Sequence, residues 1–256
     1  MTLKRTARRI FIDVGASYGQ TAEIALNPKY GFDQIFLIEP ATECLSRLNC
    51  FKSQKIIIFP IALSNTNNEM LLFGSGSLGA SIYPDKRYFD GSLEPKSVNV
   101  VDASEFIKTN VEKSDTVYLK LNCEGGEANI LESLLDSNEI AGIQYLYVDF
   151  DIKKIPSQSH REPLIKERLK ASGIDFTDPV NFIESGWNGV RFWLDLVIKI
   201  EKVSFQNYFN YQTFGYLKPK PRLKKLIKTC IPKVLKNNNT YFRSTHSYFR
   251  RLLSDY

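Results

Sequence analysis

Residues 9–21 constrain the fold most, because they join an apolar run to a glycine turn. The apolar run, residues 10–14, has the composition of a buried strand. It ends in the spacing Asp13-x-Gly15-x-x-x-Gly19, and helix-compatible residues follow the second glycine. A buried strand, a glycine turn and a helix in this order open a mononucleotide-binding unit, whose helix N-terminus favours a negatively charged group. The segment therefore predicts a ligand site where the first strand ends.

An acidic residue at the tip of the next predicted strand strengthens that prediction. Residues 34–39 form an apolar strand that ends in Glu39, twenty residues after Gly19. An acid in this position can accept hydrogen bonds from both ribose hydroxyls of a nucleoside. The order of glycine turn, helix, strand and acid favours a nucleoside-containing cofactor. The alternative is an α/β domain with an ordinary turn and a surface glutamate.

Predicted strands and helices alternate along the chain, as in an α/β domain with a parallel sheet. The predicted strands are residues 9–15, 34–39, 55–61, 116–121 and 144–150, and the predicted helices are residues 20–26, 41–51, 104–109, 128–136 and 162–172. The continuous apolar run within residues 55–61 is typical of a strand covered on both faces. A glycine turn between residues 181–183 and 190–200 predicts an antiparallel hairpin. We expect a mostly parallel sheet closed by this hairpin.

A glycine- and serine-rich loop interrupts the alternation. It follows a short predicted strand, residues 70–73, and spans residues 74–79 before the predicted strand at residues 97–101. Loops of this composition tend to be mobile and to carry functional residues. Residues 74–79 are therefore a candidate lid over the predicted ligand site.

Charge divides the chain into two parts. Residues 217–256 contain eleven Lys and Arg residues and one Asp, whereas residues 1–216 contain 23 basic and 27 acidic residues. A mildly acidic domain that carries a strongly basic segment suggests a separate role for each part. We predict one domain at residues 1–203 and a basic, partly amphipathic C-terminal tail at residues 204–256.

The tail contains an apolar stripe with helix spacing and a basic remainder. The stripe consists of Leu223, Leu226, Ile227, Cys230, Ile231, Val234 and Leu235. The tail could be a closing helix packed on the domain, or it could lie on an anionic membrane through residues 217–236, where each Lys or Arg contributes about 1 kcal/mol. Binding to RNA or DNA is a third role, which we favour less. A membrane location would suit an enzyme that acts on lipid-linked glycans.

Cysteine usage bears on where the protein resides. Cys44, Cys50, Cys123 and Cys230 are scattered and form no Cys-x-x-Cys pair. This usage fits reduced thiols in the cytoplasm better than a disulfide framework or a zinc site. No apolar run approaches the roughly 18 residues of a spanning helix. We predict a cytoplasmic protein, with peripheral attachment at the inner face of a membrane if the tail binds lipid.

Five short segments carry a resemblance to a known family. Residues 11–21, 38–40, 61–64, 101–102 and 119–127 occur in the order found in FkbM-type methyltransferases. The most specific segment is Lys120-x-x-x-Glu124-Gly-x-Glu127, although Asn122 stands where the family usually has Asp. The chain resembles the family over about residues 9–151. The resemblance implies a Rossmann-like class I methyltransferase sandwich that uses S-adenosylmethionine, mostly for O-methylation of sugars, polyketides and related hydroxyl compounds.

The expected cofactor site combines several strand ends. The glycine turn would bring backbone against the methionine part of the cofactor, and Asp13 would reach its amino group. Glu39 would hold the ribose, and Ala62 would lie near the adenine. Ligands of open parallel sheets bind beyond the carboxyl ends of the strands, so Asn122 faces the same crevice. The predicted cofactor-binding residues are Asp13, Gly15, Ala16, Gly19, Glu39, Ala62 and Asn122.

Methyl transfer to oxygen requires a group that removes the hydroxyl proton. Glu124 is the first candidate base, and its alternative role is a charge that favours the N-terminus of the next helix. His160 is the second candidate, because an imidazole exchanges protons near neutral pH, and its alternative is a surface residue. Asp151 faces the same place from the end of the fifth parallel strand. Mg²⁺, which prefers oxygen ligands, is a less favoured additional cofactor, and we assign no metal ligand.

The sequence favours an S-adenosylmethionine-dependent O-methyltransferase that acts on a hydroxyl of a carbohydrate, a glycan or a related small molecule. Cys123 follows the strand at which cytosine methyltransferases carry a Pro-Cys nucleophile, but Asn precedes it here, which favours a small buried thiol. Two alternatives stay open. One is a nucleic-acid-binding methyltransferase that uses the basic tail, and the other is a protein that keeps the fold without the activity, as Asn122 suggests.

Overall fold

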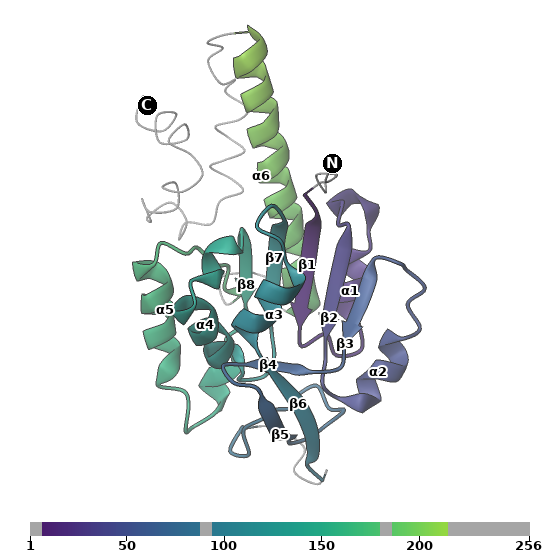
Figure 1. Ribbon diagram of the computed structural model, residues 1–256, viewed down its shortest axis with the longest axis vertical. Helices are drawn as coiled ribbons and strands as arrows, with labels where there is room; N and C mark the ends of the chain where they lie inside the picture. Colours follow the sequence, from purple (N-terminus) through teal and green to yellow (C-terminus); the bar gives the residue numbers. More distant parts are fainter. Residues whose placement is uncertain (1–6, 88–93, 180–185, 215–256) are drawn as a thin grey trace. The chain divides into compact units, whose positions relative to one another are not determined.

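The computed structural model describes residues 7–87, 94–179 and 186–214 (Figure 1). For residue 200 and residues 202–214 it describes the backbone alone. The chain divides into two compact units, residues 1–191 and residues 192–256. The first unit contains the sheets and every predicted site residue. The domain boundary predicted between residues 203 and 204 stays a prediction, and the basic segment 217–236 lies outside the described residues.

Five strands form a parallel sheet with the order β3-β2-β1-β7-β8. They are β1 (Arg9–Val14), β2 (Gln34–Ile38), β3 (Ile56–Phe59), β7 (Thr116–Leu121) and β8 (Tyr145–Val148). Each lies within one of the predicted strands. The strand order reverses at β1, which lies between β2 and β7, and open parallel sheets bind ligands at such a switch point. The predicted α/β, Rossmann-like fold class is confirmed.

Helices connect the strands and cover both faces of the sheet. The α-helices of the described residues are α1 (Gln20–Ala25), α2 (Thr42–Leu48), α3 (Ala103–Asn110), α4 (Glu127–Asp136), α5 (Arg161–Ala171) and α6 (Gly186–Phe214). Short 3-10 helices lie at η1 (Pro28–Tyr30), η2 (Glu139–Gly142) and η3 (Asp151–Lys154). The first five α-helices overlap the five predicted helices within a few residues at each end.

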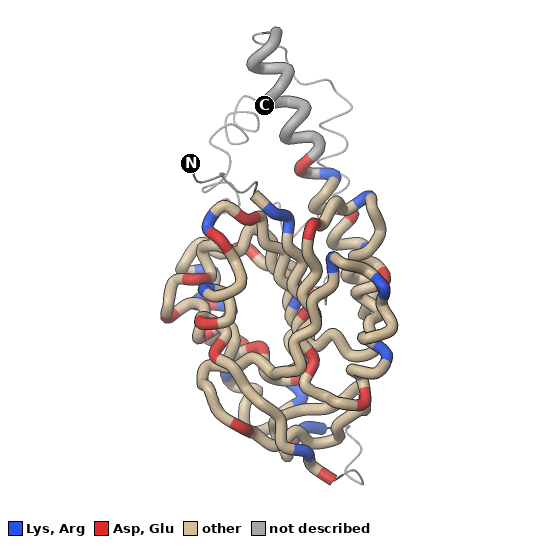
Figure 2. The backbone as a smooth tube through the Cα atoms, turned by 45° about the vertical axis from the view of Figure 1, so that its right-hand side comes forward, with Lys and Arg blue, Asp and Glu red and all other residues tan. Residues whose placement is uncertain are grey.

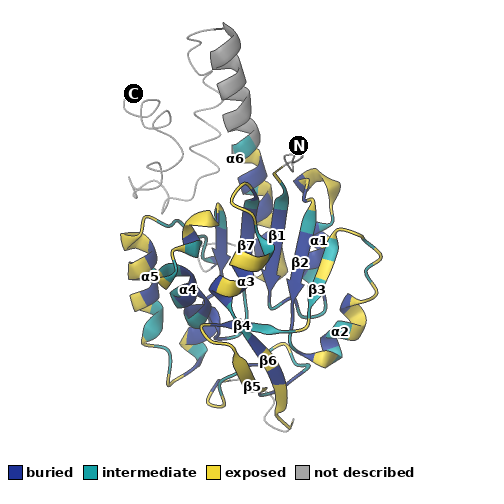
Figure 3. Ribbon diagram, viewed as in Figure 1, coloured by how far each residue is buried: buried dark blue, intermediate teal, exposed yellow. Residues whose placement is uncertain are grey.

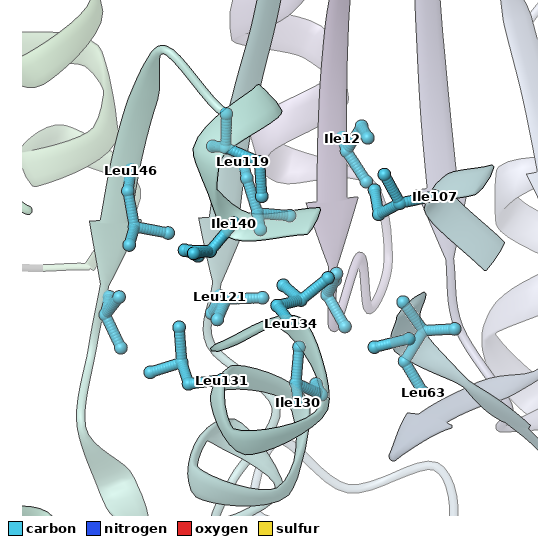
Figure 4. Close-up of a cluster of buried hydrophobic side chains, with 14 of the residues drawn as sticks. Ile12, Leu63, Ile107, Leu119, Leu121, Ile130, Leu131, Leu134, Ile140 and Leu146 are labelled. Atoms are coloured by element: carbon cyan, nitrogen blue, oxygen red, sulfur yellow. The ribbon is translucent and has the colours of Figure 1, made fainter. Parts of the chain in front are cut away.

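The main hydrophobic core lies between one face of the sheet and helices α3, α4 and α5. Successive strand residues point to opposite faces, so Ile12 of β1 and its neighbour Leu119 of β7 point the same way. Figure 4 shows these side chains converging with Leu131 and Leu134 of α4. The central strands are accordingly buried along most of their length (Figure 3). This core fixes the position of the turns that follow β1 and β7.

The opposite face of the sheet carries aromatic rings and two charged side chains. Phe11 of β1 and Tyr118 of β7 pack around Phe32, whose ring centroid lies 5.3 Å and 5.0 Å from theirs. Helix α1 contacts β1 and β2 on this side. Asp13 and Lys120 follow the two aromatic residues and are direct neighbours in the parallel register. A charged pair is thus placed inside the sheet, immediately below the turn after β1.

A small three-stranded sheet lies beyond the carboxyl ends of the parallel strands (Figure 1). It consists of β4 (Ala62–Ser64), β6 (Lys96–Asp102) and β5 (Asn68–Leu72), in that order. β4 pairs with β6 in parallel and β5 pairs with β6 in antiparallel fashion. Asp102 then caps α3, because its Oδ1 accepts hydrogen bonds from the N–H groups of Ser104 at 2.9 Å and Glu105 at 3.1 Å. Strand β4 is too short to have been predicted.

The predicted closing hairpin is wrong. Residues 190–200 belong to the long helix α6, and residues 181–183 lie outside the described residues. The physical reason is the spacing of the apolar residues. Val190, Trp193, Leu194 and Val197 recur at intervals of three and four residues, which is the period of a helix. The apolar residues in 190–200 are so numerous that composition alone favoured a strand over a helix.

The expectation that residues 55–61 form a fully covered strand is also wrong. Strand β3 is the edge of the parallel sheet, and Ile57 is 37% exposed. Apolar composition alone does not distinguish an edge strand from a central one.

Acidic and basic residues are interspersed over the described backbone (Figure 2), and their numbers in residues 1–216 are nearly equal.

Candidate active site

A cavity of about 270 Å³ lies at the carboxyl ends of the parallel strands. The turn after β1, the end of β2, strand β4 and the turn after β7 all contribute to its wall. Five of the predicted cofactor-binding residues line it, namely Gly15, Ala16, Glu39, Ala62 and Asn122. Glu124, the first candidate base, lines the same cavity. The predicted cofactor end and the predicted catalytic end therefore share one space.

Gly15 allows two strand ends to approach each other closely. Its φ of +77° lies in the left-handed region, and a Cβ at this position would lie 1.9 Å from the carbonyl oxygen of Asn122. The N–H groups of Gly15 and Ala16 donate to the carbonyl oxygen of Ile38 at 3.0 Å and 3.1 Å. Backbone from three strand ends thus meets at this turn. Gly19 packs closely against Phe51, because a Cβ on Gly19 would overlap the Phe51 ring. Gly19 does not line the cavity.

Glu39 is almost completely buried and holds the turn with both carboxylate oxygens. Oε2 accepts from the N–H of Ser17 at 2.8 Å, and Oε1 accepts from the N–H of Ala41 at 2.9 Å. Burial raises the pKa of Glu39, and these two hydrogen bonds oppose the rise. Each carboxylate oxygen can accept about two hydrogen bonds, so both keep capacity for a ligand hydroxyl. The position suits the predicted contact with a ribose.

Asp13 and Lys120 form a buried ion pair beneath the turn. Lys120 Nζ lies 2.7 Å from Asp13 Oδ1, and both side chains are nearly inaccessible to solvent. The same Nζ donates to the carbonyl oxygens of Gly15 at 2.9 Å and Val14 at 3.3 Å. Burial raises the pKa of the Asp13 carboxyl, and the charge of Lys120 opposes the rise. Lys120 also lines the cavity, whereas Asp13 does not.

Lys120 is a further candidate site residue, to which the sequence pattern assigned no role. The available signal was a lysine inside an otherwise apolar strand, Thr116–Leu121. Lysine is rarely buried unless it is paired, so such a position predicts a buried acidic partner. Oδ2 of Asp13 has no hydrogen-bond partner among the described residues, and Lys120 is the member of the pair that lines the cavity.

The turn after β7 places Asn122 beside Gly15, and Glu124 follows two residues later in the cavity wall. Oδ1 of Asn122 is buried and has no hydrogen-bond partner in the described part of the chain. Glu124 has a φ of +58°, in the left-handed region that residues other than glycine seldom adopt. Its carbonyl oxygen accepts a hydrogen bond from Ser81 Oγ at 2.7 Å, and its carboxylate forms an ion pair with Lys86. Two contacts therefore hold an unfavourable backbone conformation.

Several acidic side chains crowd the same place. Burial and the neighbouring Asp151 carboxyl raise the pKa of Glu124 to about 7, and Lys86 opposes the rise. Asp151 does not line the cavity, but its carboxyl is near enough to Glu124 to raise the pKa of that group, and it lies 2.7 Å from Lys154 Nζ. A carboxyl with a pKa near 7 can accept and release a proton at neutral pH.

Glu127 organises the turn after β7 from inside the protein. Its Oε1 accepts from the N–H groups of Cys123 and Gly125, each at 3.1 Å. Burial raises the pKa of Glu127 to about 7, although hydrogen bonds from these backbone groups oppose the rise. Cys123 is half-buried and lines the cavity, and desolvation raises the pKa of its thiol well above the usual value, which disfavours a nucleophile.

The segment from Phe73 to Arg87, here called the strap, crosses the cavity and contains the candidate lid. Leu78 lines the cavity, and the segment is anchored rather than loose. Tyr18 donates its hydroxyl to the carbonyl oxygen of Gly76 at 2.7 Å, and Ser75 Oγ lies 2.9 Å from Glu43 Oε2. At the far end, the N–H of Arg87 donates to the carbonyl oxygen of Lys154 at 2.9 Å. The strap thus joins α2 to η3 over the site.

Two features expected or weighed from the sequence are not brought to the cavity. His160 is exposed just before α5 and does not line the cavity. Within residues 7–87, 94–179 and 186–214, no group of three or more His, Cys, Asp or Glu side chains is placed to hold a metal ion.

Within the described residues, no helix combines the length and the apolar composition that a membrane span requires.

The fold and the cavity define a class of protein before any comparison is made. A parallel sheet of this order, with a glycine turn and a strand-end acid around a cavity at its switch point, is typical of Rossmann-like proteins that bind a nucleoside cofactor. Residues 13–171 match the family model of the methyltransferase FkbM domain. The chain belongs to this family of methyltransferases, and the family predicted from the sequence is confirmed.

A comparison with solved structures matches the chain to a crystal structure of methyltransferase FkbM from Methylobacillus flagellatus KT. The two chains are 13% identical with a TM-score of 0.40. The match covers 66% of this chain and 39% of the other, so the chain spans well under half the length of that protein. Among curated proteins, no match was found.

Proposed function

We propose that the protein is an S-adenosylmethionine-dependent O-methyltransferase that acts on a hydroxyl of a carbohydrate. The observation that carries the proposal is the single cavity, which has Gly15 and Glu39 at one end and Glu124 at the other. A cofactor held at the first end would present its methyl group toward a hydroxyl near the second. The methyltransferase family of the chain supports the class of reaction.

The residues at the first end fit the cofactor. The turn at Gly15 leaves no Cβ between the cavity and the backbone, and Glu39 offers carboxylate oxygens to ribose hydroxyls. Asn122 lines the cavity, and its Oδ1 is a buried acceptor without a hydrogen-bond partner among the described residues, which a ligand ammonium group would satisfy. When bound, S-adenosylmethionine supplies an electrophilic methyl group on a sulfonium sulfur.

Glu124 would remove the proton from the acceptor hydroxyl. Glu124 lines the cavity, and its pKa of about 7 lets a large fraction of its carboxyl be ionised at neutral pH. The hydroxyl proton would pass to the Glu124 carboxylate as the acceptor oxygen takes the methyl group, whose bond to the sulfonium sulfur would break and leave the thioether S-adenosylhomocysteine. Positioned proton transfer of this kind contributes typically about 10²–10⁴-fold to a rate.

Two exposed apolar residues support a carbohydrate as the acceptor. Trp187 is 47% exposed and Leu78 is 63% exposed, and both line the cavity. Residues that are both exposed and cavity-lining lie where the cavity opens. An aromatic ring offers a flat apolar surface to the C–H face of a sugar ring, while the polar groups deeper in the cavity can bind its hydroxyls.

Calorimetric titration tests the cofactor part of the proposal. S-adenosylmethionine and S-adenosylhomocysteine should bind the wild-type chain, and Glu39→Ala should weaken both by about 10-fold or more, because it removes a charged hydrogen-bond partner. Glu69→Ala, which removes an exposed acid on β5, is the matched control and should bind like the wild type. A folded wild-type chain that binds neither compound would contradict the proposal.

The acceptor part is tested by transfer of labelled methyl groups to a panel of methyl glycosides. Trp187→Ala should raise KM for any glycoside that is methylated, and Trp187→Phe should restore much of the loss. Phe192→Ala is the control, because Phe192 is as exposed as Trp187 and does not line the cavity. Equal activity of all three variants would contradict a stacking role for Trp187.

We also propose that the basic segment 217–236 holds the enzyme at an anionic membrane, where lipid-linked glycans would be acceptors. Its support is the charge of the sequence, eleven basic residues against one acid in residues 217–256. The full chain should sediment with anionic vesicles and not with neutral ones. Replacement of Lys224, Lys225 and Lys228 by Gln should reduce that binding. Equal binding to both kinds of vesicle, or preferential binding to RNA, would contradict the proposal.

A further inference from the structure

Lys86 is a buried lysine whose side chain reaches the candidate base. It is only 5% exposed, which is uncommon for a lysine. Its Nζ forms an ion pair with Glu124 Oε2 and donates a hydrogen bond to the carbonyl oxygen of Gly79 at 2.7 Å. Lys86 lies 38 residues before Glu124 in the chain, so the contact exists only because the strap crosses the site.

The strap holds both partners of the ion pair between Lys86 and Glu124. Next to Lys86, Asp85 accepts hydrogen bonds from the N–H of Ser157 at 2.8 Å and from its hydroxyl at 3.1 Å. Ser81, earlier in the strap, donates to the carbonyl oxygen of Glu124 at 2.7 Å. The strap thus grips the backbone of Glu124 with Ser81 and its carboxylate with Lys86. Both the direction of the side chain and its strained backbone depend on this segment.

Charges of both signs face Glu124 from the surrounding elements. Asp151 of η3 is the nearest acid, and Lys154 of the same 3-10 helix is paired with Asp151. Two carboxylates and two ammonium groups therefore balance each other. The other titratable groups nearby are Lys120 of β7, Cys123 and Glu127 at the start of α4, Asp149 after β8 and Tyr83 of the strap.

Removal of Lys86 would leave the two carboxylates facing each other with one ammonium group. Adjacent carboxyls cannot both ionise easily, so one of them would retain a proton. A protonated Glu124 cannot accept the proton of a hydroxyl. Lys154 is already bound to Asp151, so the ammonium group that remains would compensate the Asp151 carboxylate.

We propose that Lys86 is a positioning residue for methyl transfer, which holds the Glu124 carboxylate in place at the cavity wall and keeps it ionised beside Asp151. The proposal rests on the proposed function, since it assigns Glu124 the role of base. In this proposal the strap supplies the positive charge of Lys86 to the site. The sequence predicted only a candidate lid in this segment.

The test is a pH titration of the full chain labelled with ¹³C at glutamate Cδ, with the Glu124 resonance assigned by Glu124→Gln. Lys86→Gln should raise the pKa of Glu124 by about one pH unit or more, because it removes an opposite charge in direct contact. Lys86→Arg should keep it close to the wild-type value. Arg47→Gln, which removes the arginine of an exposed ion pair with Glu23 away from the strap, is the control and should change nothing. An unchanged Glu124 pKa in folded Lys86→Gln would overturn the proposal.

A second measurement needs no variant at position 86. In the wild-type chain, the Lys86 Cε resonance should shift at the same pH midpoint as the Glu124 Cδ resonance, and separate midpoints would overturn the proposal. Titration with S-adenosylhomocysteine separates this failure from that of the proposed function. If the wild type binds that compound but Lys86→Gln leaves the Glu124 pKa unchanged, only the role of Lys86 is lost. If the wild type does not bind it, the methyltransferase proposal itself fails.

Discussion

The two ends of the cavity are built in different ways. At the first end, backbone groups of Gly15, Ala16 and Ser17 meet the carbonyl of Ile38 and the carboxylate of Glu39. At the second end, ion pairs and hydrogen bonds of Lys86, Asp151 and Ser81 hold Glu124. The first end is shaped by backbone geometry, and the second by side-chain charge. A cofactor common to many reactions can be held by a rigid turn, whereas a base must change its protonation during the reaction.

The largest effect should come from a steric change at the first end. Gly15→Ala places a Cβ 1.9 Å from the Asn122 carbonyl oxygen in a left-handed conformation. Overpacking and the unfavourable backbone together should lower the free energy of unfolding by about 3–5 kcal/mol, and cofactor binding should be lost with it. Urea denaturation measures the first effect and calorimetry the second.

Gly173→Ala is the matched control for that prediction. Gly173 also has a left-handed φ, +69°, but a Cβ there would meet nothing within 4 Å. Its cost should be limited to the backbone term, about 1–2 kcal/mol, with cofactor binding unchanged. Similar losses for the two variants would show that the close approach at Gly15 is unimportant, and the contrast between the two ends would weaken.

A somewhat smaller effect is expected from the buried pair that lies under the first end. Lys120→Met leaves Asp13 buried without its partner, and breaking a buried pair typically costs about 3–4 kcal/mol. The double variant Asp13→Asn with Lys120→Met should regain much of that free energy of unfolding, because no unpaired charge is left. Losses that simply add in the double variant would indicate that the two side chains act independently.

The contrast between the two ends also explains what the sequence could predict. Asp13, Gly15, Gly19 and Glu39 stand in local patterns set by the strand–turn–helix unit, so their places were predicted from spacing. Lys86 and Lys120 act through contacts with residues 38 and 106 positions away. The apolar strand around Lys120 indicates that an acidic partner exists, but no local pattern identifies the partner of either lysine. Which residue becomes the ion-pair partner of a lysine is decided only when the chain folds.

The errors in the fold have the same origin. The five parallel strands were predicted within a few residues, because apolar runs and their turns are local signals. The exposure of β3 depends on which strands become its neighbours, and strand order is not encoded in composition. The error at helix α6 has a different cause. The helical period of residues 190–197 was present in the sequence, but the length of the apolar run favoured a strand.

A pH effect should distinguish the charge-built end. The folded pKa of Glu127 is raised to about 7, so between the unfolded pKa near 4.5 and pH 7 the folded chain holds a proton that the unfolded chain releases. The free energy of unfolding therefore falls as pH rises through this window. Glu127→Gln removes that dependence and should gain about 1–3 kcal/mol relative to the wild type between pH 5 and pH 8. Glu69→Gln, at an exposed acid, should track the wild type, and an equal slope for Glu127→Gln would contradict the prediction.

The smallest effect is expected where the strap is held by an exposed charge. The pKa of Glu43 is lowered to about 2, chiefly by its hydrogen bond with Lys96, so this pair stabilises the fold above the unfolded pKa and is lost as pH falls toward 2. Lys96 and Glu43 are about half and one third exposed, and solvent screens such pairs, so Lys96→Gln should cost less than about 1 kcal/mol at pH 7 and almost nothing at 1 M salt. Arg47→Gln, in an equally exposed pair away from the strap, should behave alike. A larger loss that persists in high salt would mean that the first half of the strap depends on charge as strongly as Lys86 and Glu124 do, and the strap would then belong wholly to the charge-built end.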